Sequence, residues 1–282
     1  MAGGESTQTV VWSSPTSRGD IVAMDSAYHV AAHNRDRDVC INSSYCGVLP
    51  ARFIAEHRPR AAIGMDCGVG PEGSAIAGLW YLEALNIPAA VADVMTAHLG
   101  NGVHLFNHGI ISFANQLAID RGVSKGMTVA DAAKLLLEND AAVGQAASAI
   151  TNRTVMFSND GRHVIATDSI AFALPEDAGK NVLVTAGHTG RSAVPYLLDA
   201  RPHGFICSDG GRGMDDSGIV GLTIVEAHGL AGATVDARLA RMGSGLSHYH
   251  DGIISAVNSH AYARNVRIGM PCAHAAELLL AT

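Results

Sequence analysis

The chain has 282 residues, of which 48% are hydrophobic, 16% are charged and 31 are glycine, and its formal net charge is −7 at pH 7. This length and composition describe one large or two ordinary compact domains, and they exclude a disordered or fibrous chain. The negative charge and the lack of a Lys/Arg run argue against nucleic acid or an anionic membrane surface as a partner. No stretch approaches the ~20 apolar residues of a membrane-spanning helix.

The five cysteines predict free thiols rather than disulfides. Their number is odd and none forms a CxxC pair: Cys40, Cys46, Cys67, Cys207 and Cys272. This favours a reducing cytoplasm. Each is expected to be a small buried apolar residue, with a nucleophilic role for Cys46 or Cys67 as the alternative because both fall in predicted loops.

The chain repeats itself. A shift of 143 residues places Asp25-Ser26 on Asp168-Ser169, and the register then continues without a gap to the C-terminus. Of the 115 positions aligned in this way (25–139 against 168–282), 37 are identical, far more than unrelated segments share. The chain is therefore a tandem duplication, with a lead-in at 1–7 that we expect to be disordered, a first repeat at 8–139, a connector at 140–152 and a second repeat at 153–282.

Each repeat predicts the same elements in chain order. A β-hairpin opens it, with an Asn159-Asp160-Gly161 turn in the second copy. A strand (39–42; 182–185), a helix (50–57; 194–200), a second strand (61–65; 204–208) and a second helix (74–86; 217–228) follow, then a third strand that ends in Asp93 or Asp236. Two helices close the unit, at 109–120 and 128–138 in the first copy. Alternating strands and helices predict an α/β fold with βαβ units, mostly parallel sheets and pseudo-twofold symmetry.

The loop after the second strand is the densest cluster of chemically useful residues. It reads DCGVGPEGS at 66–74 and DGGRGMDDS at 209–217. Its glycines, Gly68, Gly70, Gly211 and Gly213, allow a ligand to approach the backbone closely. Ser74 and Ser217 stand where a helix N-cap is expected. A purely structural turn is the alternative.

The first copy of this loop also resembles the dinucleotide-binding pattern GxGxxG, with Asp93 20 residues beyond Gly73 (93 − 73 = 20). Asp216 replaces the third glycine in the second copy, and Glu72, Asp215 and Asp216 would repel a pyrophosphate. A dinucleotide is therefore not predicted.

Carboxylates and a histidine lie where the strands end. Asp66 and Asp209 begin the glycine loops, where such a residue serves as a base, a metal ligand or a clamp on the backbone. The loop after the first strand carries Tyr45 in the first copy and His188 in the second. In open α/β sheets ligands bind beyond the carboxyl ends of the strands, which is where these residues are expected.

The two copies differ most in arginine. The second copy carries Arg191, Arg212, Arg238 and Arg241 where the first has Val48, Val69, Met95 and His98. Guanidinium groups at loops suit a carboxylate or phosphate. The alternative is that they form salt bridges with Asp209, Asp215, Asp216 and Asp236 and bind nothing else.

Histidines in the last third of each repeat raise a metal site as an alternative. His104 and His108 would share one face of a helix, which suits zinc, but no acidic residue lies between them as in HExxH and the second copy lacks the pair. The shared motif GIIS..N, with Ser112 and Asn115, is interpreted as a helix with two polar groups one turn apart.

These residues predict an enzyme that acts on a small polar, anionic metabolite in the cleft between the two repeats, by general acid–base chemistry of the hydrolase, lyase or isomerase kind. Asp66, Asp209 and His188 are the predicted proton-transfer residues. Further residues are expected to contact the substrate: Arg191, Arg212, Tyr45, Gly68, Gly70, Gly211, Gly213, Ser74, Ser217 and Arg241. No cofactor or metal is assigned, with a divalent ion as the alternative. We expect a homo-oligomer in the cytoplasm. The competing hypothesis is a non-catalytic regulatory module that binds a nucleotide or a carboxylate.

Overall fold

The computed structural model describes residues 7–141 and 152–281. The chain divides into two compact units. The first comprises Met1–Cys67 and Ala75–Ile150, and the second comprises Gly68–Ser74 and Thr151–Thr282. Most of the predicted lead-in and connector, residues 1–6 and 142–151, lies outside the described residues.

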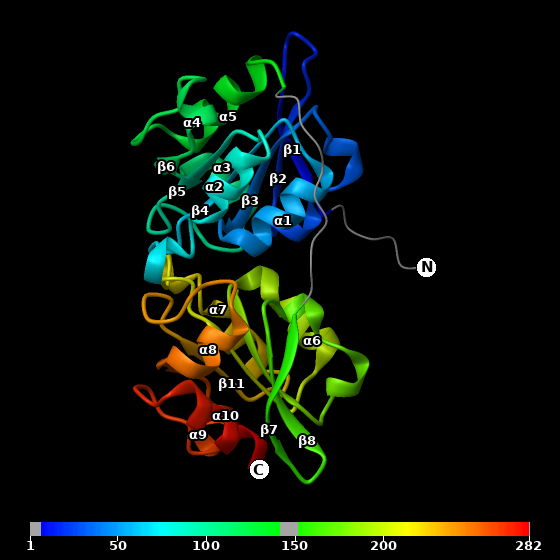
Figure 1. Cartoon of the computed structure of the whole chain (residues 1–282), viewed down its shortest axis with the longest axis vertical. Coiled ribbons are helices and arrows are strands. Elements are labelled where there is room, and N and C mark those ends of the chain that lie inside the picture. Colours follow the sequence, from blue (N-terminus) through cyan, green and yellow to red (C-terminus); the bar gives the residue numbers. More distant parts are fainter. Residues whose placement is uncertain (1–6, 142–151, 282) are drawn as a thin grey trace. The chain divides into compact units, whose positions relative to one another are not determined.

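The first unit is built on a six-stranded sheet in the order β1-β2-β3-β4-β5-β6 (Figure 1). Strands β2 to β5 are parallel, whereas β1 and β6 are antiparallel edge strands. The strands are β1 (Thr9–Ser13), β2 (Asp20–Met24), β3 (Val39–Tyr45), β4 (Ala61–Met65), β5 (Ala89–Ala92) and β6 (Ile111–Ala114).

The second unit repeats this sheet strand for strand, in the order β12-β11-β10-β9-β8-β7. Again four parallel strands, β8 to β11, lie between antiparallel edges. The strands are β7 (Arg153–Asn159), β8 (Arg162–Thr167), β9 (Val182–His188), β10 (Gly204–Ser208), β11 (Gly232–Val235) and β12 (Ile254–Val257). The predicted duplication of an α/β unit with a hairpin at its start is confirmed.

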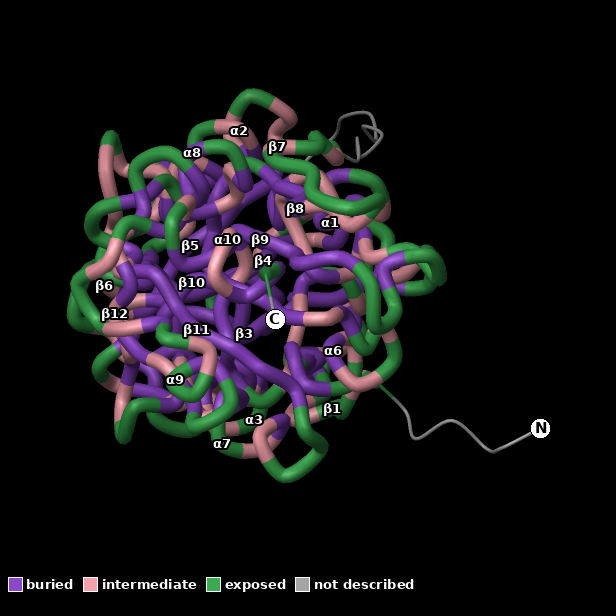
Figure 2. The backbone as a smooth tube through the Cα atoms, turned by 90° about the horizontal axis from the view of Figure 1, so that it is seen from below, coloured by how far each residue is buried: buried purple, intermediate pink, exposed green. Residues whose placement is uncertain are grey.

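Helices cover both faces of each sheet. In the first unit they are α1 (Val48–His57), α2 (Gly78–Ala84), α3 (Gly102–His108), α4 (Gln116–Ile119) and α5 (Val129–Glu138). In the second unit they are α6 (Val194–Ala200), α7 (Val220–Glu226), α8 (Gly245–Asp251), α9 (Ser259–Ala263) and α10 (Cys272–Ala281). Within each unit burial follows the central strands and the inner faces of these helices, and exposed residues fall mainly on loops (Figure 2).

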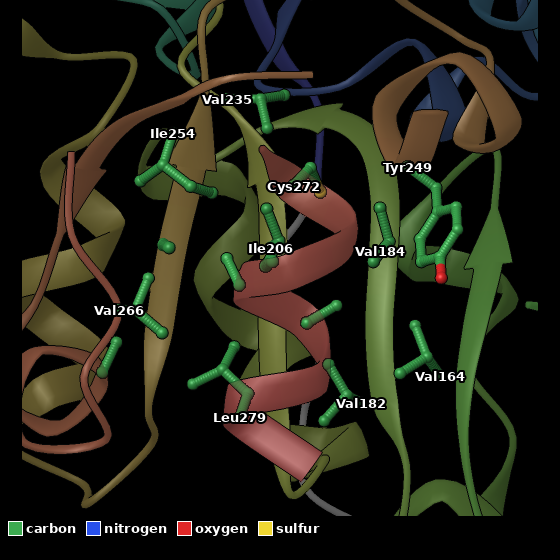
Figure 3. Close-up of a cluster of buried hydrophobic side chains, with 14 of the residues drawn as sticks. Val164, Val182, Val184, Ile206, Val235, Tyr249, Ile254, Val266, Cys272 and Leu279 are labelled. Atoms are coloured by element: carbon green, nitrogen blue, oxygen red, sulfur yellow. The ribbon is translucent and has the colours of Figure 1, made fainter. Parts of the chain in front are cut away.

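The core of the second unit shows how the layers are held. Helix α10 lies against the sheet, and its Cys272 and Leu279 belong to one buried apolar cluster with Val182 and Ile206 (Figure 3). On the opposite face Leu197 of α6 and Val225 of α7 pack in a separate apolar cluster. Because a parallel strand buried on both faces needs apolar residues on both, β9 begins Val-Leu-Val rather than alternating with polar residues.

Local sequence explains the ends of several elements. The hairpin turn between β7 and β8 places Asp160 at φ 47° and Gly161 at φ 73°, as the type I′ turn predicted from Asn-Asp-Gly requires. Thr128 caps α5 by accepting a hydrogen bond from the N–H of Asp131. The shared Asp-Ser pair is also structural. Asp25 and Asp168 accept hydrogen bonds from the first N–H groups of α3 and α8, Gly102 and Gly245.

Two sequence predictions are wrong. Ser74 and Ser217 are not N-caps, because each ends a 3-10 turn (Pro71–Gly73; Met214–Asp216) and the helices α2 and α7 begin only at Gly78 and Val220. The predicted helix at 109–120 is instead the edge strand β6 followed by the short α4.

The reason lies in Asn115. Its side-chain oxygen caps α4 through the N–H of Ala118 and also accepts from the N–H of Ala89. Its amide donates to the carbonyls of Leu79 and Ile87. Asn258 repeats this arrangement in the second unit. A side chain that ties four backbone groups belongs at the junction of two elements, not on one face of a helix.

In the described parts of the chain, no helix combines the length and the apolar character needed to cross a membrane.

Candidate functional site

The carboxyl ends of β8 to β11 bring the second unit's polar residues to one edge of its sheet. His188 is the last residue of β9 and lies in register with Ser208, the last residue of β10. Asp209 follows directly. Two of the three predicted proton-transfer residues therefore stand at neighbouring strand ends. Asp66 holds the equivalent place in the first unit, after β4. That Asp66 and Asp209 face one common cleft stays a prediction.

His188 is held as a neutral imidazole. Its Nδ1 accepts a hydrogen bond from the N–H of Gly190 at 3.0 Å, so the ring proton resides on Nε2. Burial lowers the pKa of His188 to about 4, and the residue is 8% exposed. Nε2 has no hydrogen-bond partner among the described residues, yet it is not among the fully buried unpartnered atoms. The ring therefore presents an N–H donor to solvent at the sheet edge.

The carboxylates of Asp209 and Asp66 hold the same backbone clamp. Asp209 Oδ1 accepts from the N–H groups of Gly211 at 2.9 Å and Ala237 at 3.0 Å. Asp66 Oδ1 accepts from the N–H of Val94, the residue equivalent to Ala237. Burial raises the pKa of Asp209, which the two backbone N–H groups oppose only in part. A carboxyl group with a raised pKa beside a neutral histidine is typical of sites that transfer protons.

The glycine loops are strained in the same way in both copies. Six of the nine residues in each have positive φ, at positions 67, 68, 69, 70, 72 and 73 and at 210, 211, 212, 213, 215 and 216. The non-glycine members include Val69 at 69° and Arg212 at 66°. A β-branched residue in this region is a rare outlier. Such strain persists only where the surroundings impose it, and it concentrates at functional sites.

Close packing of backbone fixes the other loop of the site. Thr189 binds the carbonyl of Ser208 through both its N–H and its hydroxyl, and the N–H of Gly221 in α7 donates to the carbonyl of Thr189. A Cβ at Gly221 would lie 2.4 Å from that carbonyl oxygen, so only glycine fits. Gly78 of α2 makes the same approach to Cys46 in the first unit. The sheet-edge histidine is thereby held on rigid backbone.

Of the four arginines that distinguish the second copy from the first, three form ion pairs with acidic side chains, and one has no such partner among the described residues. Arg212 pairs with Asp216 at 2.7 Å and Arg238 with Asp236 at 2.8 Å. Arg241 pairs with Glu72 at 2.6 Å, in the segment Gly68–Ser74 that belongs to the second unit. Arg191 is exposed and has no acidic partner among the described residues. It lies three residues after His188, so one unpaired guanidinium group accompanies the neutral imidazole.

The corresponding edge of the first unit has a different chemistry. Tyr45, which aligns with His188, is buried. All five cysteines are free and buried, and burial raises the pKa of Cys46 to about 12. A thiol with that pKa is not a nucleophile at neutral pH. The alternative role for Cys46 therefore has no support in its surroundings.

The histidines of the first unit stack rather than chelate. The rings of His98 and His104 lie 4.0 Å apart and nearly parallel, and those of His104 and His108 lie 4.3 Å apart. His104 Nδ1 accepts from the N–H of His98. The described residues include no group of three or more His, Cys, Asp or Glu side chains placed to hold a metal ion.

Two buried features were missed by sequence reasoning. One is a pair of Asn/Asp clamps, formed by Asn34 with Asp38 and by Asp177 with Asn181. Their signal was available in the self-alignment, because the amide and the carboxylate exchange places between the copies. The other is His248, which is fully buried where the first unit has Leu105. A histidine aligned with a leucine in a helix was the signal there.

No family model, no curated protein and no solved structure matches this chain. Its function must therefore be argued from its own residues.

Proposed function

We propose that the chain is an enzyme that acts on a small anionic metabolite by general acid–base chemistry, with His188 of the second unit at its centre. The observation that carries this proposal is the state of His188. Its ring is buried and neutral, its tautomer is fixed by Gly190, and its Nε2–H has no partner among the described residues. A neutral imidazole of this kind donates a hydrogen bond to a substrate oxygen on which negative charge develops.

The neighbours of His188 supply the other two functions that such a reaction needs. Arg191 begins the following turn and has no acidic partner in the part of the chain that the structure describes, so it would hold a carboxylate or phosphate. Asp209, whose pKa is raised by burial, would accept the proton. Hydrolysis, elimination and isomerisation share this step, in which an oxygen gains charge while a base takes a proton. The proposal therefore covers all three reaction types.

The test is a screen followed by matched substitutions. Thermal-shift measurements against carboxylates and phosphorylated metabolites, each assayed for turnover, identify the substrate class. His188→Ala is expected to lower kcat about 10²–10⁴-fold, the usual contribution of a general acid. His188→Gln, which keeps an N–H donor near the Nε2 position, should retain part of the activity. The control is His228→Ala, which removes an exposed histidine. Full activity in His188→Ala would end the proposal.

The carboxylates need a paired test because each also clamps the backbone. Asp66→Asn and Asp209→Asn each keep a side-chain oxygen that can accept the clamp's hydrogen bonds, and each removes the ionisable carboxylate. If Asp209 alone transfers protons, only Asp209→Asn abolishes turnover at equal loss of stability. If both act, as the sequence predicts, both variants lose turnover.

A second candidate function is a non-catalytic module that binds a carboxylate or a nucleotide. One observation favours it: Asp66 and Asp209 make the same backbone clamp in both units, which gives both carboxylates a structural role without proton transfer. It predicts saturable stabilisation, about 2.7 kcal/mol at a ligand concentration of 100 Kd, without turnover of any bound ligand.

The proposal also includes a cytoplasmic location, supported by five unpaired buried thiols. It includes self-association, supported only by the low charge content of 16%. Sedimentation at several protein concentrations tests the latter. A single monomeric species across the range would remove it.

A further inference from the structure

The second unit contains a groove whose lining does not include His188. It has a volume of about 530 Å³ and lies between α7 and the end of β12. That volume falls within the ~300–1,000 Å³ of small-molecule sites. Its lining comprises five apolar residues, called the floor below, and six polar residues, called the rim: Ile219, Val220, Leu222, Ala256 and Val257, and Asp215, Asp216, Thr223, Glu226, Asn258 and Ser259.

The repeat explains why this groove is open. Thr223 and Ala256 align with Trp80 and Phe113, whereas Ile219, Leu222, Glu226 and Asn258 align with residues of the same or similar type. Trp80 and Phe113 are 58% and 40% exposed, so both aromatic residues lie at the surface of the first unit. Replacing two aromatic rings by a hydroxyl-bearing side chain and a methyl group leaves room for a ring of comparable size.

The negative charge of the rim favours a cationic ligand. Three carboxylates and no cationic side chain line the groove. The pKa of Glu226 is lowered by the backbone and side chain of Ser259, and that of Asp216 by Arg212, so both are ionised at neutral pH. Asp216 uses Oδ1 for Arg212, which leaves Oδ2 for a ligand. The ion pair between them is solvent-exposed, so it contributes little and can be shared with an incoming cation.

We propose that this groove binds a small aromatic amine, whose ring takes the space that Trp80 and Phe113 occupy in the first unit and whose ammonium group meets Asp216 and Glu226. The apolar floor desolvates the ring, and the rim neutralises the charge. The site is distinct in chemistry from the anion site proposed at His188, and it does not depend on that proposal.

The experiment uses the full chain and three probes of one shape. Calorimetric titration with 2-phenylethylamine is expected to show one saturable site per chain. 3-Phenylpropionate, an anion of similar size, and 2-phenylethanol, a neutral analogue, should bind at least tenfold more weakly. No saturable binding of the amine, or equal binding of the anion in the same groove, would overturn the proposal.

Substitutions from the first unit locate the site. The double variant Thr223→Trp/Ala256→Phe refills the groove with side chains that the fold already accommodates, and it should weaken amine binding at least tenfold. Asp216→Gly installs the glycine that the first repeat has at this position, where φ is 56° and glycine is favoured, and it should weaken binding by removing a carboxylate from the rim. Trp80→Thr is the control and should leave the affinity unchanged. Undiminished binding in both groove variants would show that the amine binds elsewhere and refute the proposal.

Discussion

The two Asn/Asp clamps make the same backbone contacts in both units but use different residues to make them. In the first unit Asn34 donates from its amide to Asp38 at 3.0 Å, and in the second Asn181 donates to Asp177 at 2.9 Å. The two residue types have exchanged positions. Both clamps nevertheless tie the same backbone groups: Asp38 and Asn181 accept from residues 20 and 163, and Asn34 and Asp177 accept from residues 31 and 174.

Because the aspartate stands at a different position in each clamp, the arginine that accompanies it also differs between the units. Asp177 pairs with Arg153 at 3.0 Å, whereas the equivalent of Arg153 in the first unit is the neutral Gln8, which binds Asn34. Asp38 instead lies 3.5 Å from Arg37. Burial would raise the pKa of Asp177, but hydrogen bonds from Arg153, Leu174 and Asn181 hold it below the usual value. Duplication has therefore preserved the contact and its charge balance rather than the residues.

The largest expected effect comes from breaking this clamp. Asp177→Asn leaves Arg153 and the Asn181 amide without their shared carboxylate, and we expect it to cost about 3–5 kcal/mol of unfolding free energy. The triple variant Arg153→Gln/Asp177→Asn/Asn181→Asp transplants the arrangement of the first unit and should recover most of that loss. Urea unfolding measures both. A triple variant no more stable than Asp177→Asn would show that the two clamps are not interchangeable.

The second expected effect is a difference between the two units in how their stability depends on pH. His188 and His248, each with a pKa lowered to about 4 by burial, align with Tyr45 and Leu105 in the first unit. In the unfolded chain a histidine takes up a proton near pH 6.5. The unfolded state therefore binds more protons between pH 6.5 and 4. Stability from these residues is complete above pH 6.5 and is lost as the pH falls, by about 3 kcal/mol per histidine at the limit.

Hydrogen exchange of peptides from each unit at pH 7 and pH 5 measures this difference. The second unit should lose protection on acidification more than the first, and the variant His188→Tyr/His248→Leu should reduce that loss. An unchanged pH dependence in the variant would contradict the assignment. His29 and His203, whose pKa values are also lowered by burial, add a smaller background in the first and second units respectively.

Much of this fold was predictable because the two repeats have the same elements, so each strand and helix could be predicted from two different sequences. Strands β4 and β10 begin and end at the predicted residues, as does α6. The prediction failed for β6, where Ser112 and Asn115 are spaced as on a helix, because a four-residue edge strand carries too little periodicity to compete. It also failed at the starts of α2 and α7, because Val69, Glu72 and Arg212 are residue types that give no sign of positive φ.

The sequence indicated where the candidate site lies, but it did not indicate the protonation of His188 or the ion pairs of the arginines. Glycines and carboxylates at strand ends indicated the edge on which His188 and Asp209 lie. The tautomer of His188 depends on one backbone N–H and its pKa depends on burial, and both are tertiary properties. The pairing of Arg212 with Asp216 and of Arg238 with Asp236 was the stated alternative to anion binding, whereas the pairing of Arg241 with Glu72 was not predicted.

The smallest expected effect concerns the strained loops. Val69 at φ 69° and Arg212 at φ 66° occupy equivalent left-handed positions, but only valine is β-branched. Asparagine tolerates this conformation, so Val69→Asn is expected to stabilise the protein by about 1 kcal/mol. Arg212→Asn should gain less, since it also breaks the pair with Asp216. Thermal unfolding of the two variants compares them directly. Because strain at a loop persists where the surroundings impose it, a loss of stability in Val69→Asn would mean that packing of the valine side chain outweighs its backbone cost.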